Sequence, residues 1–126
     1  MTLDPRFCVT PAPPYYAVIF SALRTAVDEG YAEAGERMFA RASRRPGFLG
    51  AQSLSSPDGF EMSVIYFTDP ASIRAWKEDT EHLAVQERGR REWYAHYQIR
   101  VARVERAYSG PAEALHPSAW EPVPSA

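Results

Sequence analysis

Cysteine is almost missing from the sequence. Cys8 is the single cysteine among 126 residues, so an intrachain disulfide and a cysteine-ligated metal cluster are both excluded. Proteins of oxidising compartments often depend on disulfides, whereas free thiols are typical of reducing compartments. We therefore expect a cytoplasmic protein that is stabilised by its hydrophobic core.

The sequence also lacks a long apolar run and an excess of one charge. The longest apolar run, residues 15–20, is far shorter than the roughly 20 residues of a transmembrane helix, and no signal-peptide pattern is present. The 14 Lys and Arg are balanced by 16 Asp and Glu, which provides no basic surface for nucleic acid. We therefore expect neither a membrane nor a nucleic-acid partner.

Motifs for bound cofactors are missing as well. The sequence has no glycine-rich nucleotide-binding motif of the GxGxxG or GxxxxGK type. His96 and His116 have no second ligand at a metal-binding spacing, and no Ser-His-Asp or Cys-His arrangement stands out. We therefore expect neither a metal nor a bound cofactor.

What the sequence does contain is the composition of one globular domain. Its 45% hydrophobic residues suffice for a core, and its 13% aromatic residues can line a pocket as well. Eight of the 11 prolines lie outside residues 15–109. We expect an extended lead-in at residues 1–14, a folded domain at 15–109 and a proline-rich tail at 110–126. In that tail, Trp120 packs either on the domain or on a partner.

The first part of the domain reads as a strand followed by a helix. Residues 15–23 are apolar in both parities, which predicts a strand covered on both faces, with Ser21 as the polar exception. Residues 31–45 carry apolar side chains at helical spacing, after a turn in which Asp28 is a candidate cap.

The middle of the domain reads as a hairpin that leads into a helix. Residues 48–55 and 61–67 are strand-like and flank a Ser-Pro-Asp-Gly turn, so we expect them to pair antiparallel. The next helix begins at Pro70, which is tolerated in a first turn, with Thr68 or Asp69 as its cap.

The last part reads as a kinked helix and a strand. We expect the kink near residues 80–82 and the end of the helix near residue 94. Residues 97–108 are strand-like, and their apolar side chains change parity at Val101 and Ala102, which predicts a β-bulge or a strong bend.

The resulting order, β-α-β-β-α-α-β, predicts an α+β fold of the ferredoxin-like type. Four antiparallel strands would carry the helices on one face only. Because the other face is also apolar, we expect a second copy of the chain to cover it, which gives a homodimer of packed sheets.

At this level of detail the chain resembles the antibiotic biosynthesis monooxygenase (ABM) domain family of dimeric α/β-barrel proteins. The resemblance spans roughly residues 15–108. The matching stretches are 15–20 (YYAVIF), Gly30-Tyr31, 46–50 (PGFLG), 72–77 (SIRAWK), Glu81-His82, Gln86, Gly89-Arg90, Trp93-Tyr94 and 100–108 (RVARVERAY). The resemblance implies a pocket between the sheet and the helices of each protomer. Characterised relatives are cofactor-independent monooxygenases of polycyclic phenols and anthrones, haem-degrading enzymes, and isomerases or cyclases of polyketide pathways.

The chain departs from two catalytic patterns of that family. The haem-degrading branch uses an Asn on the first strand, a Trp ending the third strand and a His on the late helix. The matching positions here are Ser21 or Ala22, Phe67 and Gln86, which argues against haem degradation. The quinone-forming branch uses strand Asn, Trp and Tyr. Here Tyr66 and Phe67 stand at the strand end without the Asn.

His82 is the candidate catalytic base, because an imidazole titrates near working pH and can remove a phenolic or carbon-acid proton. The alternative is a structural His that hydrogen-bonds across the helix junction. Tyr66 is a second catalytic candidate, because either it or Gln86 would orient the substrate oxygen. Tyr66 is equally consistent with core packing.

The candidate substrate-binding residues come from the strands and from the late helices. They are Ser21, Phe67, Trp76, Gln86, Arg90 and Trp93. The two Trp are also consistent with core packing, and Arg90 with an intrahelical pair to Glu87. The sequence thus predicts a cofactor-independent ABM-type monooxygenase of a small aromatic or polyketide-like substrate, with O2 as co-substrate. The alternative is a non-catalytic dimeric small-molecule-binding or accessory protein, or a non-oxidative isomerase or cyclase of the same superfamily.

Overall fold

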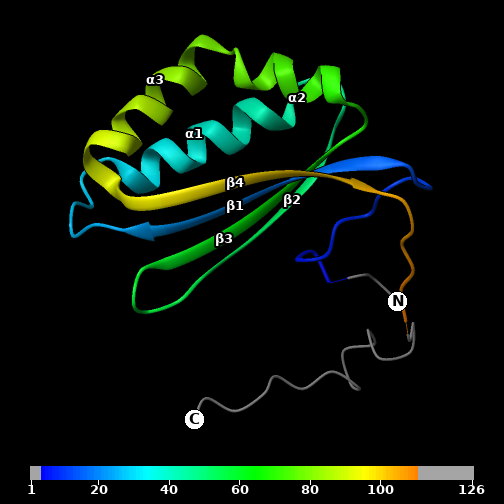
Figure 1. Cartoon of the computed structure of the whole chain (residues 1–126), viewed down its shortest axis with the longest axis horizontal. Coiled ribbons are helices and arrows are strands. Elements are labelled where there is room, and N and C mark those ends of the chain that lie inside the picture. Colours follow the sequence, from blue (N-terminus) through cyan, green and yellow to red (C-terminus); the bar gives the residue numbers. More distant parts are fainter. Residues whose placement is uncertain (1–3, 111–126) are drawn as a thin grey trace.

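The structure, a computed structural model, describes residues 4–110 and consists of one sheet under one layer of helices (Figure 1). In chain order the elements are β1 (Tyr15–Arg24), α1 (Tyr31–Ser43), β2 (Phe48–Ser55), β3 (Phe60–Phe67), α2 (Pro70–Lys77), α3 (Thr80–Arg88), the π-helical turn η1 (Gly89–Trp93) and β4 (Tyr94–Val104). This order confirms the predicted α+β ferredoxin-like fold. His116 and Trp120 lie outside the described residues.

The sheet is antiparallel with the strand order β2-β3-β1-β4. Its register places Val18 of β1 between Ile65 of β3 and Val101 of β4. Because successive side chains of a strand point to opposite faces, these three lie on the face that the helices cover. The core on that face comprises Ala42, Phe67 and Trp76, with Val18, Met38, Phe48, Ile65 and Ile73 packed against them.

The opposite face of the sheet, called the open face below, carries none of the helices in residues 4–110. The N-terminal segment before β1, blue in Figure 1, passes along part of this face. A side chain at Gly50 of β2 would meet the Cys8 sulfur at 2.8 Å, so Cys8 packs directly on the backbone of an edge strand. Beyond this segment, Leu54 and Met62 leave 80% and 45% of their surfaces exposed.

The start of α1 differs from the prediction that Asp28 caps it. The N-cap is Gly30, in the left-handed conformation with φ 76°, and no side chain caps the helix. Asp28 instead accepts a hydrogen bond from Arg24 at 3.0 Å. The prediction was wrong because the glycine makes the turn into the helix, while an arginine of β1 binds the carboxylate.

The two later helices begin at aspartate caps. Asp69 accepts from the Ser72 amide at 2.7 Å, with Pro70 in the first turn, as predicted. Asp79 accepts from the amides of Glu81 and His82 at 3.1 Å each, and this cap separates α3 from α2 close to the expected kink. The buried Asp79 carboxylate also accepts from the Arg41 Nε at 2.7 Å, which joins α1 to the junction.

The predicted bulge at Val101 and Ala102 is wrong. The pairing of β1 with β4 is regular there, and its register shifts instead between Leu23 and Arg24. The reason is that η1 delivers the chain into β4 at Tyr94, three residues earlier than expected, and the irregularity is absorbed at that entry. The parity changes in the sequence because Ile99 and Val101 lie on the helix-covered face of the sheet, whereas Ala102 and Val104 lie on the open face.

Candidate functional site

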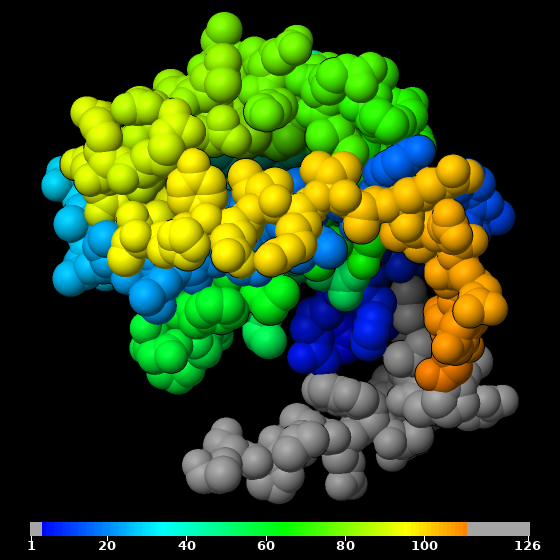
Figure 2. Space-filling model, in the orientation of Figure 1, coloured from blue at the N-terminus to red at the C-terminus, as the bar shows by residue number. Residues whose placement is uncertain are grey.

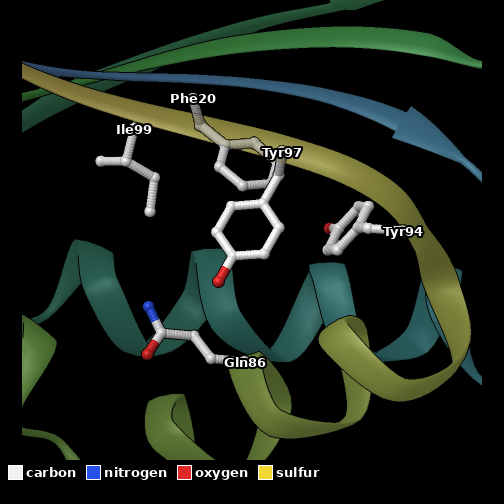
Figure 3. Close-up of a pocket in the computed structure, with 5 residues that line it drawn as sticks. All are labelled: Phe20, Gln86, Tyr94, Tyr97 and Ile99. Carbon is white, nitrogen blue, oxygen red and sulfur yellow. The ribbon is translucent and has the colours of Figure 1, made fainter.

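A small pocket lies between α3 and the helix-covered face of β1 and β4 (Figure 3). Its lining residues are Phe20, Gln86, Tyr94, Tyr97 and Ile99. Figure 3 shows Tyr97 reaching from β4 toward α3, with Tyr94 and Ile99 on either side of it. The volume of about 40 Å³ accommodates a polar edge of a ligand rather than a whole polycyclic molecule.

The wall of the pocket is aromatic because of the sheet register. Ile99 pairs opposite Phe20, and Tyr97 has the same parity as Ile99, so all three side chains face α3. The Phe20 ring stacks on Tyr97 at 6.0 Å between centroids and meets the edge of Tyr94 at 5.4 Å. These rings form a rigid apolar surface against which a planar ligand can lie.

The pocket lies at the edge of the sheet, because Tyr94, Tyr97 and Ile99 come from the edge strand β4. Figure 2 shows β4, in yellow and orange, running along this side of the molecule beneath the helices. Ile99 is 46% exposed although it lines the pocket. Among residues 4–110, no strand pairs with the outer side of β4.

A chain of hydrogen bonds runs from the pocket to β3. The hydroxyls of Tyr94 and Tyr31 are 3.1 Å apart, and the Tyr31 hydroxyl donates to the Glu61 carboxylate. Ser55 donates to the other oxygen of Glu61 at 3.0 Å. The Arg24 guanidinium lies over the Tyr31 ring, 3.3 Å from its centroid.

Burial keeps both tyrosines of this hydrogen-bonded chain, Tyr31 and Tyr94, protonated. Burial is the main cause that raises the pKa of Tyr94. Burial, and next the hydrogen bond to Glu61, raise the pKa of Tyr31 well above its usual range. Neither phenol is therefore a tyrosinate near neutral pH, and each keeps one hydrogen to donate.

His82 lies on α3 beside the core. Its Nδ1 is 2.9 Å from the Trp76 carbonyl oxygen, and its ring stacks on the Trp76 indole at 4.1 Å and 13°. A nitrogen that faces a carbonyl carries the proton, so Nε2 holds the lone pair. Burial is the main cause that lowers the pKa of His82, against the opposing effects of the Trp76 carbonyl and Asp79. The structure therefore shows the hydrogen bond across the junction of α2 and α3 that a structural His82 would make. The same surroundings favour a neutral imidazole, which a catalytic base requires.

Of the predicted binding residues, Gln86 lines the pocket, one helical turn after His82. Arg90 forms the intrahelical pair with Glu87 at 2.7 Å. The neighbouring Tyr97 hydroxyl, followed by the hydrogen bond with Glu87, raises the pKa of Arg90. His82 and Gln86 therefore lie one turn apart on one face of α3, and Arg90 follows in the π-helical turn η1.

The predicted aromatic residues lie behind the pocket rather than in its lining. Phe67 of β3 and Trp76 of α2 are buried together in the core, with Ala42 of α1. Trp93 is buried in η1, where its Nε1 donates to the Glu29 carbonyl at 3.0 Å and its ring meets Tyr31 edge-on at 5.3 Å. Trp93 thereby helps to hold Tyr31 in place.

Ser21 and Tyr66 lie on the open face, so the sheet separates them from His82. Ser21 pairs opposite Met62, and both have the parity that points away from the helices. Tyr66 meets the Tyr15 ring at 5.7 Å. Burial, together with the neighbouring Cys8 thiol, raises the pKa of Tyr66. The structure therefore does not bring these two hydroxyls to the pocket beside α3.

Sequence reasoning missed four of the five lining residues of the pocket. It also missed the hydrogen bond between Tyr31 and Glu61. The signal for Phe20, Tyr97 and Ile99 was present, because all three follow the helix-facing parity once β1 and β4 are paired. Tyr94 was hidden because it was assigned to the end of a helix. Glu61 was hidden because a charged residue at a strand end usually faces solvent.

The described residues hold neither a metal-ligand cluster nor a membrane-spanning helix. Among residues 4–110, no three His, Cys, Asp or Glu side chains come together as metal ligands. Over the same part of the chain, no helix combines the length and apolar character needed to cross a bilayer.

No known protein-family model matches the sequence. The uncharacterized protein YqjZ of Bacillus subtilis (strain 168) is 47% identical over 97 residues, which cover 77% of this chain and 85% of that protein.

Solved structures with the same fold are more distant in sequence. SnoaB, a cofactor-independent oxygenase from Streptomyces nogalater, matches with a TM-score of 0.65 at 13% identity, over 75% of this chain and 97% of that one. A putative antibiotic biosynthesis monooxygenase from Nitrosomonas europaea matches with a TM-score of 0.62 at 16% identity, over 76% and 94%. Protein SO0527 from Shewanella oneidensis matches with 0.65 at 13%, over 72% and 91%. At such identities the likeness establishes the fold, which is that of the ABM dimeric α/β-barrel proteins.

Proposed function

This chain belongs to the family of Bacillus subtilis YqjZ and has the ABM fold, and we propose that it is a cofactor-independent monooxygenase of a small aromatic or polyketide-like substrate. The site is the pocket beside α3. The observation that carries the proposal is that Gln86, Tyr94 and Tyr97 bring polar groups to one aromatic-walled pocket, while the imidazole of His82 stands one helical turn before Gln86 on the same helix. A likeness of fold alone would be a weak argument for activity.

The proposed chemistry begins with proton removal by His82 Nε2. Because burial lowers the pKa of His82, it takes protons only from acidic groups, such as an electron-rich phenol or the activated CH2 of an anthrone. The resulting carbanion reduces O2 directly, and the hydroperoxide formed loses water. The net change converts CH2 and O2 into C=O and H2O. An apolar pocket wall protects the reactive intermediates from solvent.

Gln86 is the proposed group that binds the substrate oxygen. Its amide can donate and accept hydrogen bonds, and Figure 3 shows it beside the Tyr97 hydroxyl. Of the two candidates for this role, Gln86 and Tyr66, only Gln86 lies on the same side of the sheet as His82. The pocket volume of about 40 Å³ means that one edge of the substrate enters while the remainder stays in the mouth.

The proposed assembly is a homodimer that packs through the open face. The support is the exposure of Leu54, Met62 and Leu23 on that face, next to the part that the N-terminal segment covers. A sheet face with this apolar content is stabilised when a second sheet removes it from water.

Oxygen consumption by single-residue variants tests the assignment of the base. The protein, free of added metal and flavin, is assayed against anthrones, naphthols and dihydroquinones. We expect His82→Ala to lower the rate at least about 100-fold, which is the usual contribution of a positioned base. His96→Ala, a change at an exposed histidine of β4, is the matched control and retains activity. A His82→Ala rate within about twofold of wild type contradicts the assignment.

A non-catalytic binding protein is the second candidate. It is favoured by the stacking and hydrogen bonding of His82 on Trp76, which is also the geometry of a purely structural imidazole. In that case ligands quench the Trp fluorescence, oxygen is not consumed, and His82→Ala changes stability alone.

A further inference from the structure

Three elements meet at the Tyr94 end of the pocket. Tyr31 begins α1, Glu61 lies at the start of β3 and Tyr94 begins β4. Their hydroxyl and carboxylate groups form one continuous hydrogen-bonded chain, in which only Tyr94 touches the pocket. The positions of the hydrogens in this chain determine what Tyr94 offers to a ligand.

The direction of the chain follows from the number of hydrogens available. An ionised carboxylate only accepts, and a phenol has one hydrogen to donate. Tyr31 gives its hydrogen to Glu61, so the Tyr31 oxygen can only accept in its contact with Tyr94 at 3.1 Å. Tyr94 must therefore donate to Tyr31. With that hydrogen committed, the Tyr94 hydroxyl can only accept from a further partner, and Tyr94 is the member of the hydrogen-bonded chain that lines the pocket.

Other contacts hold this direction in place. The Ser55 hydroxyl donates to the second carboxylate oxygen of Glu61, which keeps this group in its accepting role. Arg24 lies over the Tyr31 ring and Trp93 meets that ring edge-on, so the Tyr31 phenol has little freedom to turn away. The hydrogen of Tyr94 is thus not readily released to a ligand.

We propose that Tyr94 is a specificity-determining residue that selects ligands carrying a neutral hydroxyl donor. A protonated phenol can donate to the Tyr94 oxygen, whereas an aryl ether or a phenolate at the same place leaves that acceptor unpaired. Tyr31 and Glu61 are positioning residues, because they act through Tyr94. The inference rests on the proposed function only in that it takes the pocket beside α3 as the substrate site. The selected hydroxyl is distinct from the proton that His82 removes.

Tyr97 has the complementary role. The Tyr97 hydroxyl lies beside the Gln86 amide in the pocket (Figure 3), and this phenol has one hydrogen to donate. The rings of Tyr94 and Tyr97 are 6.1 Å apart between centroids. The pocket therefore offers an acceptor and a donor side by side. The matching ligand is an aromatic ring with one hydroxyl and a neighbouring oxygen acceptor.

The test compares two probes of nearly equal shape, 2-naphthol and 2-methoxynaphthalene, by isothermal titration calorimetry without oxygen. Wild type is expected to bind the naphthol about tenfold more tightly, since one hydrogen bond to a partly buried acceptor is made or lost. The naphthol affinity falls as pH rises through the probe's own pKa, whereas the ether affinity does not change.

The variants change each member of the hydrogen-bonded chain in turn. Tyr94→Phe removes the acceptor and abolishes the preference. Tyr31→Phe leaves the Tyr94 hydrogen without its acceptor, so Tyr94 can donate to the ether and the two affinities become similar. Glu61→Gln can donate to Tyr31 and reverse the chain, so the preference shrinks or inverts. Tyr108→Phe, at an exposed position, is the control that keeps the preference. Because the readout is a ratio of two affinities on one sample, loss of folded protein does not imitate it.

Any one of three results would overturn the inference. The wild type binds both probes equally, it binds neither probe, or the preference for the naphthol survives both Tyr94→Phe and Tyr31→Phe. The outcome is separable from that of the proposed function. If the protein consumes oxygen but does not prefer the naphthol, the proposed monooxygenase activity stands and the proposed selectivity of Tyr94 is refuted. If it prefers the naphthol but consumes no oxygen, the selectivity stands and the monooxygenase activity is refuted.

Discussion

His82 and Trp76 are joined twice, by ring stacking at 4.1 Å between centroids and by a hydrogen bond of 2.9 Å between the imidazole Nδ1 and the Trp76 carbonyl. The contact crosses the junction of α2 and α3, where Asp79 caps the second helix. It ties the orientation of the candidate base to the core. One side chain therefore has consequences for stability as well as for chemistry.

The first prediction is a pH dependence of stability that belongs to His82. Its pKa in the folded protein is below the ordinary value of 6.5, because burial disfavours the charged ring. As pH falls below that ordinary value, the unfolded state takes up a proton that the folded state resists, so the stability from neutral His82 is progressively lost. Urea midpoints should therefore fall more for wild type than for His82→Gln between about pH 7.5 and pH 5. Parallel curves for the two proteins would show that His82 does not titrate in this way.

The second prediction concerns the cap of α3. Asp79→Ala removes the acceptor of two helix amides and the buried partner of Arg41. We expect thermal unfolding to shift down by about 5 °C or more. Asp69→Ala is the matched control, because it removes the cap of α2 from an exposed site without an arginine partner. Its shift should be smaller, and an equal shift would mean that the arginine contacts add nothing.

Acid should weaken the same junction. The hydrogen bond from Arg41 is the main cause that holds the pKa of Asp79 below its ordinary value of 3.8. The stabilisation from this carboxylate is present above that value and is lost as pH falls through the lower, folded-state pKa. The stability difference between wild type and Asp79→Ala should therefore narrow in that acid range, as measured by urea titration.

The third prediction compares the effects on stability of alanine substitutions at two glycines. Gly47 has φ 87°, and an added Cβ would lie 2.1 Å from the Ser72 Oγ, at the start of α2. Gly47→Ala should lower the free energy of unfolding by about 2 kcal/mol or more through strain and overlap. Gly35 lies inside α1 with nothing within 4 Å of an added Cβ, so Gly35→Ala should raise it by about 0.5–1 kcal/mol. Changes of the same sign in urea denaturation would contradict this account.

The fourth prediction tests the homodimer. Met62→Glu places a charge on the open face and should convert the dimer into monomers in sedimentation velocity, because burial of an unpaired charge opposes association. Val101→Glu, on the other face of the sheet and 57% exposed, should leave the dimer intact. A wild-type monomer at micromolar concentration would refute the assembly directly.

Much of the fold could be predicted because its determinants are local. Residues 15–23 and 61–67 are strand-like, and because side chains alternate along a strand, their numbering alone decides which of them share a face. The Asp69-Pro70 pair marks a helix start. The bounds of β1, β2 and β3 agree with prediction to within one residue. Asp79 was also recoverable, since an aspartate before Thr80 and Glu81 is a common cap pattern.

The site was less predictable because it depends on contacts between distant residues. The hydrogen bond between Tyr31 and Glu61 joins residues 30 positions apart, and the one between Tyr31 and Tyr94 spans 63. Both require the strand register and the early entry into β4, which no local pattern specifies. The separation of Tyr66 from His82 by the sheet likewise follows from parity only after β1 and β3 are paired.

The most direct test of the central claim is oxygen uptake by the wild-type protein, without added metal or flavin, on a panel of anthrones, naphthols and dihydroquinones. The account predicts saturable uptake, with one O2 consumed for each CH2 converted into C=O and water as the second product. The absence of uptake over the whole panel, together with tight ligand binding by Trp fluorescence quenching, would contradict it and identify a binding protein or an isomerase.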